Sequence, residues 1–196
     1  LRDYQVFHDG KPVMSTDVIA SIERWMSKDS LGMEIKKRLA SMKAVGEKSF
    51  RITLNEPFGQ VLNGLGRMTA YPLFIMPERM AKTPIGELTE WIGSGPFKLV
   101  EDEWIPGIKF AVEKNDAYVP RSEPADNMSG GKIPGVDRIE RLVFSDGVSA
   151  ANALMAGEID YLAGTPTEYL PLMEDAGLSY KPLPNRGASV QIVLNH

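Results

Sequence analysis

The stretch FHDGKP at residues 7–12 predicts a turn, because Asp-Gly followed by Pro favours a change of chain direction. Directly after this stretch, Val18, Ile22 and Trp25 recur at helical spacing. The recurrence predicts an amphipathic helix over residues 15–27, with Trp25 on its buried face. The turn and the helix together begin the first of two blocks into which turn chemistry and periodicity divide the chain.

The rest of the first block combines helices with a hairpin. Ser30 is expected to cap a second helix over Leu31–Ser41. Apolar residues alternate on both sides of a polar turn at residues 46–49, which predicts a β-hairpin. A short helix is predicted near residues 59–65, and the apolar run at residues 73–76 is interpreted as a buried, strand-like segment.

The second block begins near Trp91 and contains two strand signals joined by a turn. Residues 97–104 and 108–114 flank Ile-Pro-Gly at 105–107, and this arrangement predicts a second hairpin. Residues 119–135 include three prolines and three glycines among mostly polar residues. Such a composition predicts a long surface loop.

Strand and helix signals alternate beyond this loop. Residues 138–144 are predicted to form a strand. Its side chains available for the core are Ile139, Leu142 and Phe144. Asp146 is expected to cap a helix that ends at Gly157, and residues 159–162 are predicted to form a further strand.

The last helix signal is the capping box Thr-Pro-Thr-Glu at residues 165–168, with Pro at the first helical position. This helix is expected to close at Gly177. Because strands and helices alternate along the chain, the sequence predicts α/β packing.

The composition excludes several classes of site. The chain has 196 residues, no cysteine and two histidines, which removes thiol nucleophiles, disulfides, Cys-ligated zinc and His-rich metal sites. A formal net charge of −4 argues against nucleic acid as the main partner. Gly-Ser-Gly-Pro at residues 93–96 lacks the ending of a phosphate-binding loop and precedes a strand, so it is interpreted as a tight turn.

The sequence gives little support for catalysis by histidine or by carboxylates. A Ser-His-Asp triad needs His8 or His196 as its base, and His8 lies inside the turn, where bonding to nearby backbone is its expected role. Glu158 and Asp160 bracket the start of a predicted strand and could act in acid–base chemistry. A hydrolase or transferase lobe that uses one of these carboxylates stays open as an alternative.

Three separated segments carry a family resemblance. The first lies within residues 1–24 and contains FHDGKP. The second is Gly-Ser-Gly-Pro-Phe-Lys-Leu at residues 93–99, with Lys-Asn-Asp-Ala-Tyr at 114–118. The third joins Val-Asp-Arg-Ile at 136–139 to the segment 153–160, which ends in Gly-Glu-Ile-Asp. In this order and spacing the segments resemble family 5 of the extracellular solute-binding proteins, the peptide, nickel and opine receptors of ABC importers.

The resemblance implies an α/β fold that is part of the first lobe of a type II periplasmic-binding-protein fold. In that fold a mixed sheet is flanked by helices, and two lobes close on a ligand. Residues 1–90 would form the extra subdomain of lobe one, residues 91–196 the central part of its main α/β subdomain, and the second lobe would be absent. Because residues 188–196 are interpreted as a strand cut short, the chain is expected to be a fragment of a longer protein.

The same resemblance implies where a ligand would bind. The loop at residues 69–73 matches a segment that faces the cleft in related receptors, and Tyr71 stands in irregular backbone, which favours binding residues. The stretch 161–165 matches the hinge-side cleft wall. There Gly164 would let the backbone approach the ligand, and the Thr165 hydroxyl would either bond to the ligand or cap the following helix. The expected ligand-binding residues are Thr69, Ala70, Tyr71, Tyr161, Ala163, Gly164 and Thr165.

The implied function is that of the substrate-binding subunit of a bacterial ABC importer. Such a subunit would bind a peptide or a similar small polar solute and deliver it to the permease subunits. It would lie in the periplasm or outside the cell, and would meet the membrane only through the permease. No enzymatic activity, cofactor, metal or nucleic acid partner is expected. A ligand-sensing module on the same fold stays open as a further alternative.

Overall fold

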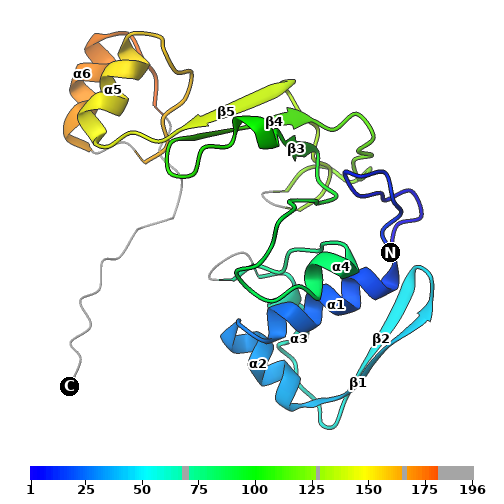
Figure 1. The fold of residues 1–196 in the computed structure, drawn as a ribbon. Coiled ribbons are helices and arrows are strands. Elements are labelled where there is room, and N and C mark those ends of the chain that lie inside the picture. The colour runs from blue at the N-terminus through cyan, green and yellow to red at the C-terminus, as the bar shows by residue number, and fades with distance from the viewer. Residues whose placement is uncertain (68–70, 127–128, 165–166, 181–196) are drawn as a thin grey trace, which may run out of the picture. The chain divides into compact units, whose positions relative to one another are not determined.

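The chain consists of two compact units, Leu1–Arg141 and Leu142–His196. Figure 1 shows their helices and strands in chain order. The computed structural model describes residues 1–67, 71–126, 129–164 and 167–180. The boundary near residue 90, inferred above from the family resemblance, stays a prediction.

Helix α1 (Ser15–Met26) is the element around which the first unit is built. Asp17 stabilises its first turn, because the carboxylate accepts a hydrogen bond of 2.8 Å from the Met14 amide and another of 2.8 Å from the Glu78 amide. One face of α1 is buried, as the apolar spacing predicted. The predicted helix is therefore confirmed to within one residue.

The core of the first unit is formed by α1, the FHDGKP turn and helix α2 (Ser30–Lys37). The turn is confirmed, since the Phe7 amide donates to the Lys11 carbonyl over 2.8 Å and Gly10 has a φ of 81°. The buried cluster consists of Phe7, Val13, Val18, Ile22, Trp25, Met26 and Ile35. The turn thus contributes an aromatic side chain to the core and is more than a connection.

The predicted bounds and cap of the second helix are wrong. Its cap is Asp29 rather than Ser30, because the Asp29 carboxylate accepts hydrogen bonds of 2.9 and 3.0 Å from two amides of the first turn. The helix ends at Lys37, and the residues predicted to continue it belong to strand β1 (Leu39–Gly46). β1 pairs antiparallel with β2 (Ser49–Leu54), which confirms the first hairpin.

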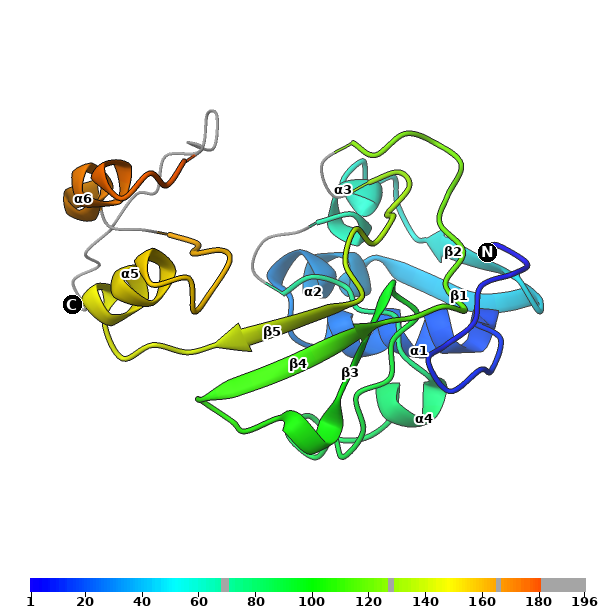
Figure 2. The same ribbon diagram turned by 90° about the horizontal axis from the view of Figure 1, so that it is seen from above.

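Two short helices complete the helical part of the first unit. Helix α3 (Val61–Leu65) falls within the range predicted for it. Helix α4 (Glu78–Ala81) lies alongside α1 in both views of the molecule, and its residues Met80 and Ala81 are buried (Figures 1 and 2).

The strand-like segment predicted at residues 73–76 forms no strand, although Leu73 and Ile75 pack against the core. These residues form irregular backbone, and Phe74 is 68% exposed. The Met76 amide donates to the Ser21 hydroxyl over 3.0 Å. Because a side chain of α1 satisfies this backbone group, the segment follows the helix and needs no neighbouring strand.

A three-stranded sheet in the order β3-β4-β5 makes up the later part of the first unit. β3 (Phe97–Leu99) and β4 (Lys109–Lys114) pair antiparallel, which confirms the core of the second hairpin. Between them, the predicted continuation of the first strand is instead the 3-10 helix η1 (Glu101–Glu103). The described part of the predicted loop at 119–135 contains no helix or strand.

Strand β5 (Arg138–Leu142) ends two residues before its predicted end. Ile139 and Leu142 are each 43% exposed, so their predicted place in the core is wrong within the described residues. Phe144 is half-buried.

Arg138 connects three elements of this sheet region through its guanidinium. It pairs with Glu103 of η1 at 2.5 Å, with Glu113 of β4 at 3.2 Å and with Glu140 of β5 at 2.8 Å. The hydrogen bond from Arg138 is the main reason why the pKa of Glu103 lies below its usual range.

The second unit contains helix α5 (Gly147–Met155), which matches its prediction. Asp146 caps this helix by accepting a hydrogen bond of 2.8 Å from the Ser149 amide, and Gly157 follows it with a φ of 72°. The strand predicted at residues 159–162 is wrong, because these residues form no strand and pair with none of the described strands.

A short 3-10 helix, η2 (Thr167–Tyr169), leads into helix α6 (Leu170–Asp175). Gly177 follows with a φ of 76°, which confirms the predicted end of the last helix. The start of the predicted capping box and the predicted C-terminal strand at 188–196 lie outside the described residues. None of the described helices combines the length and the apolar character that crossing a bilayer requires.

The His8 ring joins the FHDGKP turn to the chain ahead of β3. Its Nδ1 accepts a hydrogen bond of 3.2 Å from the Gly93 amide, and its Nε2–H donates to the Gly95 carbonyl over 3.2 Å. These bonds assign the neutral tautomer with its proton on Nε2. Burial lowers the pKa of His8, and the charge of Lys98 lowers it further. His8 bonds to backbone as expected, but the partners lie 85 and 87 positions away.

We expect His8→Gln to flatten the pH dependence of folding stability between about pH 7.5 and 5.5. The pKa of His8 is lowered in the folded chain, so the unfolded chain takes up the proton first and the free energy of unfolding falls as the pH falls. Gln retains a donor and an acceptor but does not titrate. Urea denaturation at several pH values measures the slope, with His196→Gln as the control. Equal slopes for wild type and His8→Gln would contradict the expectation.

Replacing Gly32 by Ala is expected to destabilise the first unit by about 1–3 kcal/mol, because overpacking of a close contact has this cost. A Cβ at Gly32 would lie 2.9 Å from the Met26 Cα and 3.2 Å from atoms of the Trp25 ring. Helix propensity alone favours Ala by about 1 kcal/mol, so the two effects have opposite signs.

Gly59→Ala is the matched control for this substitution, since a Cβ there would meet nothing within 4 Å. Both variants are compared with the wild type by urea denaturation. A Gly32→Ala variant that is more stable than the wild type would show that the helices do not pack as closely as described.

Candidate functional site

Tyr71 combines an exposed side chain with an anchored backbone. Its side chain is 63% exposed, whereas its carbonyl accepts a hydrogen bond of 2.7 Å from the indole N–H of Trp25. Trp25 itself is 6% exposed and belongs to the core. Tyr71 can therefore present a phenol ring to a ligand from a fixed position, while the neighbouring predicted residues Thr69 and Ala70 lie outside the described part of the chain.

Arg67, four residues before Tyr71, faces a buried carboxylate. Its guanidinium Nη1 lies 3.5 Å from Oδ2 of Asp29, and the Asp29 side chain is 1% exposed. The other carboxylate oxygen of Asp29 accepts the capping hydrogen bonds of α2. Because a buried carboxylate needs a compensating partner, Arg67 has a structural role at this position.

The second predicted segment, residues 161–165, lies in the other unit and begins six residues after the end of α5 at Met155. Tyr161 is 80% exposed, Ala163 is exposed, and Gly164 has a φ of 71°. This left-handed backbone conformation suits glycine and leaves no Cβ between the main chain and a ligand. Thr165 lies outside the described residues, so the choice between ligand bonding and helix capping stays a prediction.

The predicted ligand-binding residues are thus divided between the two units. Tyr71 belongs to the first unit, and Tyr161, Ala163 and Gly164 belong to the second. Each described member has the exposure that ligand contact requires. Their assembly into one site stays a prediction.

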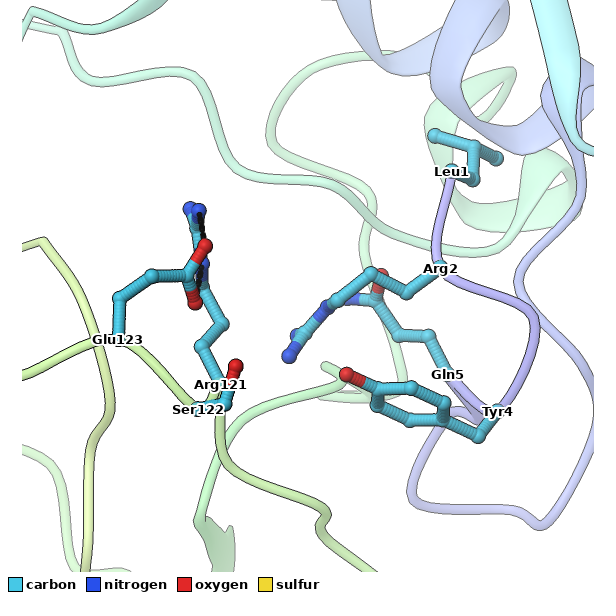
Figure 3. A pocket seen from close by; sticks show the side chains of 7 residues that line it. All are labelled: Leu1, Arg2, Tyr4, Gln5, Arg121, Ser122 and Glu123. Carbon is cyan, nitrogen blue, oxygen red and sulfur yellow. Dashed lines mark hydrogen bonds and ion pairs between the residues drawn. The ribbon is translucent and has the colours of Figure 1, made fainter.

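A cavity that sequence reasoning missed lies within the first unit. It has a volume of about 450 Å³ and is shown in Figure 3. Its lining residues are Leu1, Arg2, Tyr4, Gln5, Arg121, Ser122 and Glu123. Two stretches about 120 positions apart form it, so no local pattern in the sequence could have indicated it.

The positive groups of this cavity already have partners. Arg121 pairs with Glu123 through two contacts of 2.6 and 3.1 Å, and the hydrogen bond from Arg121 is the main cause that lowers the pKa of Glu123 to about 2. The Arg2 guanidinium lies 5.5 Å from the centre of the Tyr4 ring and donates to the Val119 carbonyl over 3.3 Å. The cavity contains none of the residues predicted to bind ligand.

The carboxylates considered for catalysis lie in open surroundings. Both Glu158 and Asp160 are exposed. Among the described residues, no group of three or more His, Asp or Glu side chains could hold a metal ion. A general acid needs burial or a like charge that raises its pKa. The described surroundings of these carboxylates do not favour the enzyme alternative.

Comparison with known proteins identifies relatives along the whole chain. The family model for the "Bacterial extracellular solute-binding proteins, family 5 Middle" matches residues 1–196. The chain is 39% identical over 200 residues to the "Probable peptide ABC transporter periplasmic-binding protein y4tO" of Sinorhizobium fredii. That match covers 100% of this chain and 37% of the relative, so the chain spans little more than a third of the relative's length.

Solved structures show the same fold. The binding protein AgaA of A. tumefacien in complex with agropinic acid is 26% identical with a TM-score of 0.68, over 89% of this chain and 33% of that one. The oligopeptide-binding protein AppA of Bacillus subtilis in complex with a nonapeptide is 28% identical with a TM-score of 0.56, over 79% and 29% of the two chains. The mixed helix-and-sheet structure resembles the first lobe of such proteins, which confirms the predicted fold class. Because its family model matches the entire sequence, the chain belongs to family 5 of the bacterial extracellular solute-binding proteins.

Proposed function

We propose that the complete protein is the substrate-binding subunit of a bacterial ABC importer and that this chain forms part of its first lobe. The observation that carries the proposal is the match of all 196 residues to the family, together with 39% identity to a relative described as a probable peptide transporter component. The ligand would be a peptide or a similar small polar solute. The chain spans 37% of that relative's length, so the remaining part of a receptor would supply further ligand contacts.

The proposed receptor acts by binding and not by catalysis. It works in the periplasm or at the outer face of the cell, without a cofactor, and meets the membrane through its permease. Ligand stabilises the closed arrangement of two lobes because it binds that arrangement more tightly, and the closed form engages the permease. Membership of a solute-binding family and the exposed surroundings of Glu158 and Asp160 support this proposal.

Within this chain, the ligand-contacting residues would be Thr69, Ala70, Tyr71, Tyr161, Ala163, Gly164 and Thr165. Two of them are exposed tyrosines, which offer an apolar ring and a hydroxyl group on the same side chain. A peptide presents both apolar side chains and backbone polar groups, so this combination suits it. The positive φ of Gly164 supports a close approach of ligand to main chain.

The full-length protein is expected to be stabilised by an equimolar pool of synthetic tri- and pentapeptides. At ligand concentrations of 100 to 1,000 times Kd, linkage predicts a gain of about 2.7–4 kcal/mol. A thermal-shift titration measures the gain, and mass spectrometry of the same samples detects any hydrolysis. Peptide cleavage that Glu158→Gln abolishes would contradict the receptor and support the enzyme alternative.

Tyr71→Ala and Tyr161→Ala should each weaken binding of the peptide pool about ten-fold or more, as truncation of aromatic contacts at binding sites commonly does. Both side chains are well exposed, so the melting temperature without peptide should change little. Tyr180→Ala is the matched control, because Tyr180 is 54% exposed but lies outside the predicted site. An equal loss in all three variants would exclude a specific role for Tyr71 and Tyr161.

A further inference from the structure

We infer that Trp25 and Asp29, at the corner between α1 and α2, are positioning residues for the ligand-facing surface at Tyr71. Neither side chain can touch a ligand itself, because they are 6% and 1% exposed. Each holds one residue of that surface region in place: Trp25 holds Tyr71, and Asp29 holds Arg67. The inference rests on the proposed function, in which Tyr71 contacts the ligand.

The orientation of the Trp25 ring is set by close packing. A Cβ on Gly32 would lie 3.2 Å from two atoms of the ring, and a Cβ on Gly64 would lie 3.3 Å from a third. The ring therefore occupies a slot that exists because α2 and α3 carry glycine at these positions. With the ring fixed, the direction of its N–H is fixed as well, and this N–H donates to the Tyr71 carbonyl over 2.7 Å.

Asp29 provides the second attachment. Its Oδ1 accepts the amides of Leu31 and Gly32, which caps α2, and its Oδ2 faces the Arg67 guanidinium at 3.5 Å. The capping bonds hold the carboxylate in one rotamer. Arg67 thus meets an acceptor that is already positioned by the helix start.

The two attachments belong to one rigid corner. The Asp29 amide donates to the Trp25 carbonyl over 3.0 Å, so the two anchoring residues are linked through the backbone as well. A ligand that meets Tyr71 would therefore meet a residue whose carbonyl is already held by the indole of Trp25. Contact with a residue that is already held costs less conformational entropy than contact with one that must order at the same time.

The test uses the full-length protein and two readouts. Trypsin cleavage after Arg67 reports local opening without any ligand, and the equimolar pool of tri- and pentapeptides reports binding by thermal shift. Trp25→Phe removes the N–H donor, and 3-benzothienylalanine at position 25 removes it while keeping the bicyclic shape, in case the smaller ring impairs folding. Trp104→Phe is the control, because Trp104 packs near Trp91 in a different part of the unit.

Loss of the hydrogen bond from Trp25 to Tyr71 is expected to raise the rate of trypsin cleavage about ten-fold and to weaken binding of the peptide pool about ten-fold. Trp104→Phe should show neither effect. Asp29→Asn keeps a capping side chain but removes the charge that faces Arg67, and should weaken pool binding in the same direction.

Unchanged cleavage in both Trp25 variants would overturn the positioning role, even if the wild type binds the pool. Faster cleavage with undiminished binding would overturn the link from Trp25 to the ligand and leave the receptor function standing. A wild type that the pool does not stabilise would contradict the proposed peptide ligand, and the inferred ligand link would fall with it. The proteolysis readout separates these cases, since it needs no ligand.

Discussion

The fit of the Trp25 ring between Gly32 and Gly64 is the contact on which the first unit depends. Three helices meet at this ring, and the space for it exists because two of them carry no side chain at the point of contact. Close packing of this kind fixes the helices relative to one another and makes the corner between α1 and α2 rigid. The hydrogen bond from the indole then extends that rigidity to the exposed chain at Tyr71.

Asp29 shows how one side chain can join local and long-range structure. One of its oxygens accepts a hydrogen bond from an amide in the first turn of α2, which would otherwise have no partner in the helix. The other oxygen faces Arg67, which is 38 positions away. The cap of α2 and the contact with Arg67 therefore depend on the same carboxylate. Its near-complete burial means that either partner would be costly to lose, since an uncompensated buried carboxylate is strongly unfavourable.

Sequence reasoning succeeded where the determinants are local. The spacing of Val18, Ile22 and Trp25 predicted α1, and Asp146 and Gly157 marked the ends of α5, because helical period and end signals lie within a few residues. It failed at residues 73–76, where an apolar run resembles a strand but the backbone is satisfied by a helix side chain. It also failed at Ile139, which is 43% exposed although the strand pattern indicated a core position. The period of a strand separates its two faces but does not show what packs against each of them.

The candidate site stays a prediction. Irregular backbone and the family resemblance indicate Tyr71 as a ligand contact, and the structure shows that its side chain is exposed. Its support by Trp25, however, joins residues 46 positions apart, and nothing in the local pattern of either residue indicates the bond. Which residues meet over such a distance in the sequence depends on how the helices pack, and this packing is seen only in the folded structure.

The charge cluster around Arg138 has a consequence for how the sheet is aligned. Its three carboxylate partners come from η1, β4 and β5, and all face one guanidinium. A slip of β5 by one residue would turn Arg138 and Glu140 together to the opposite face of the sheet and leave Glu103 and Glu113 beside Ile139 instead. Exposed ion pairs add little to stability, but the misaligned pairing would lose the contacts of Arg138 with Glu103 and Glu113. Arg138 therefore favours the observed register of β5 over the register shifted by one residue.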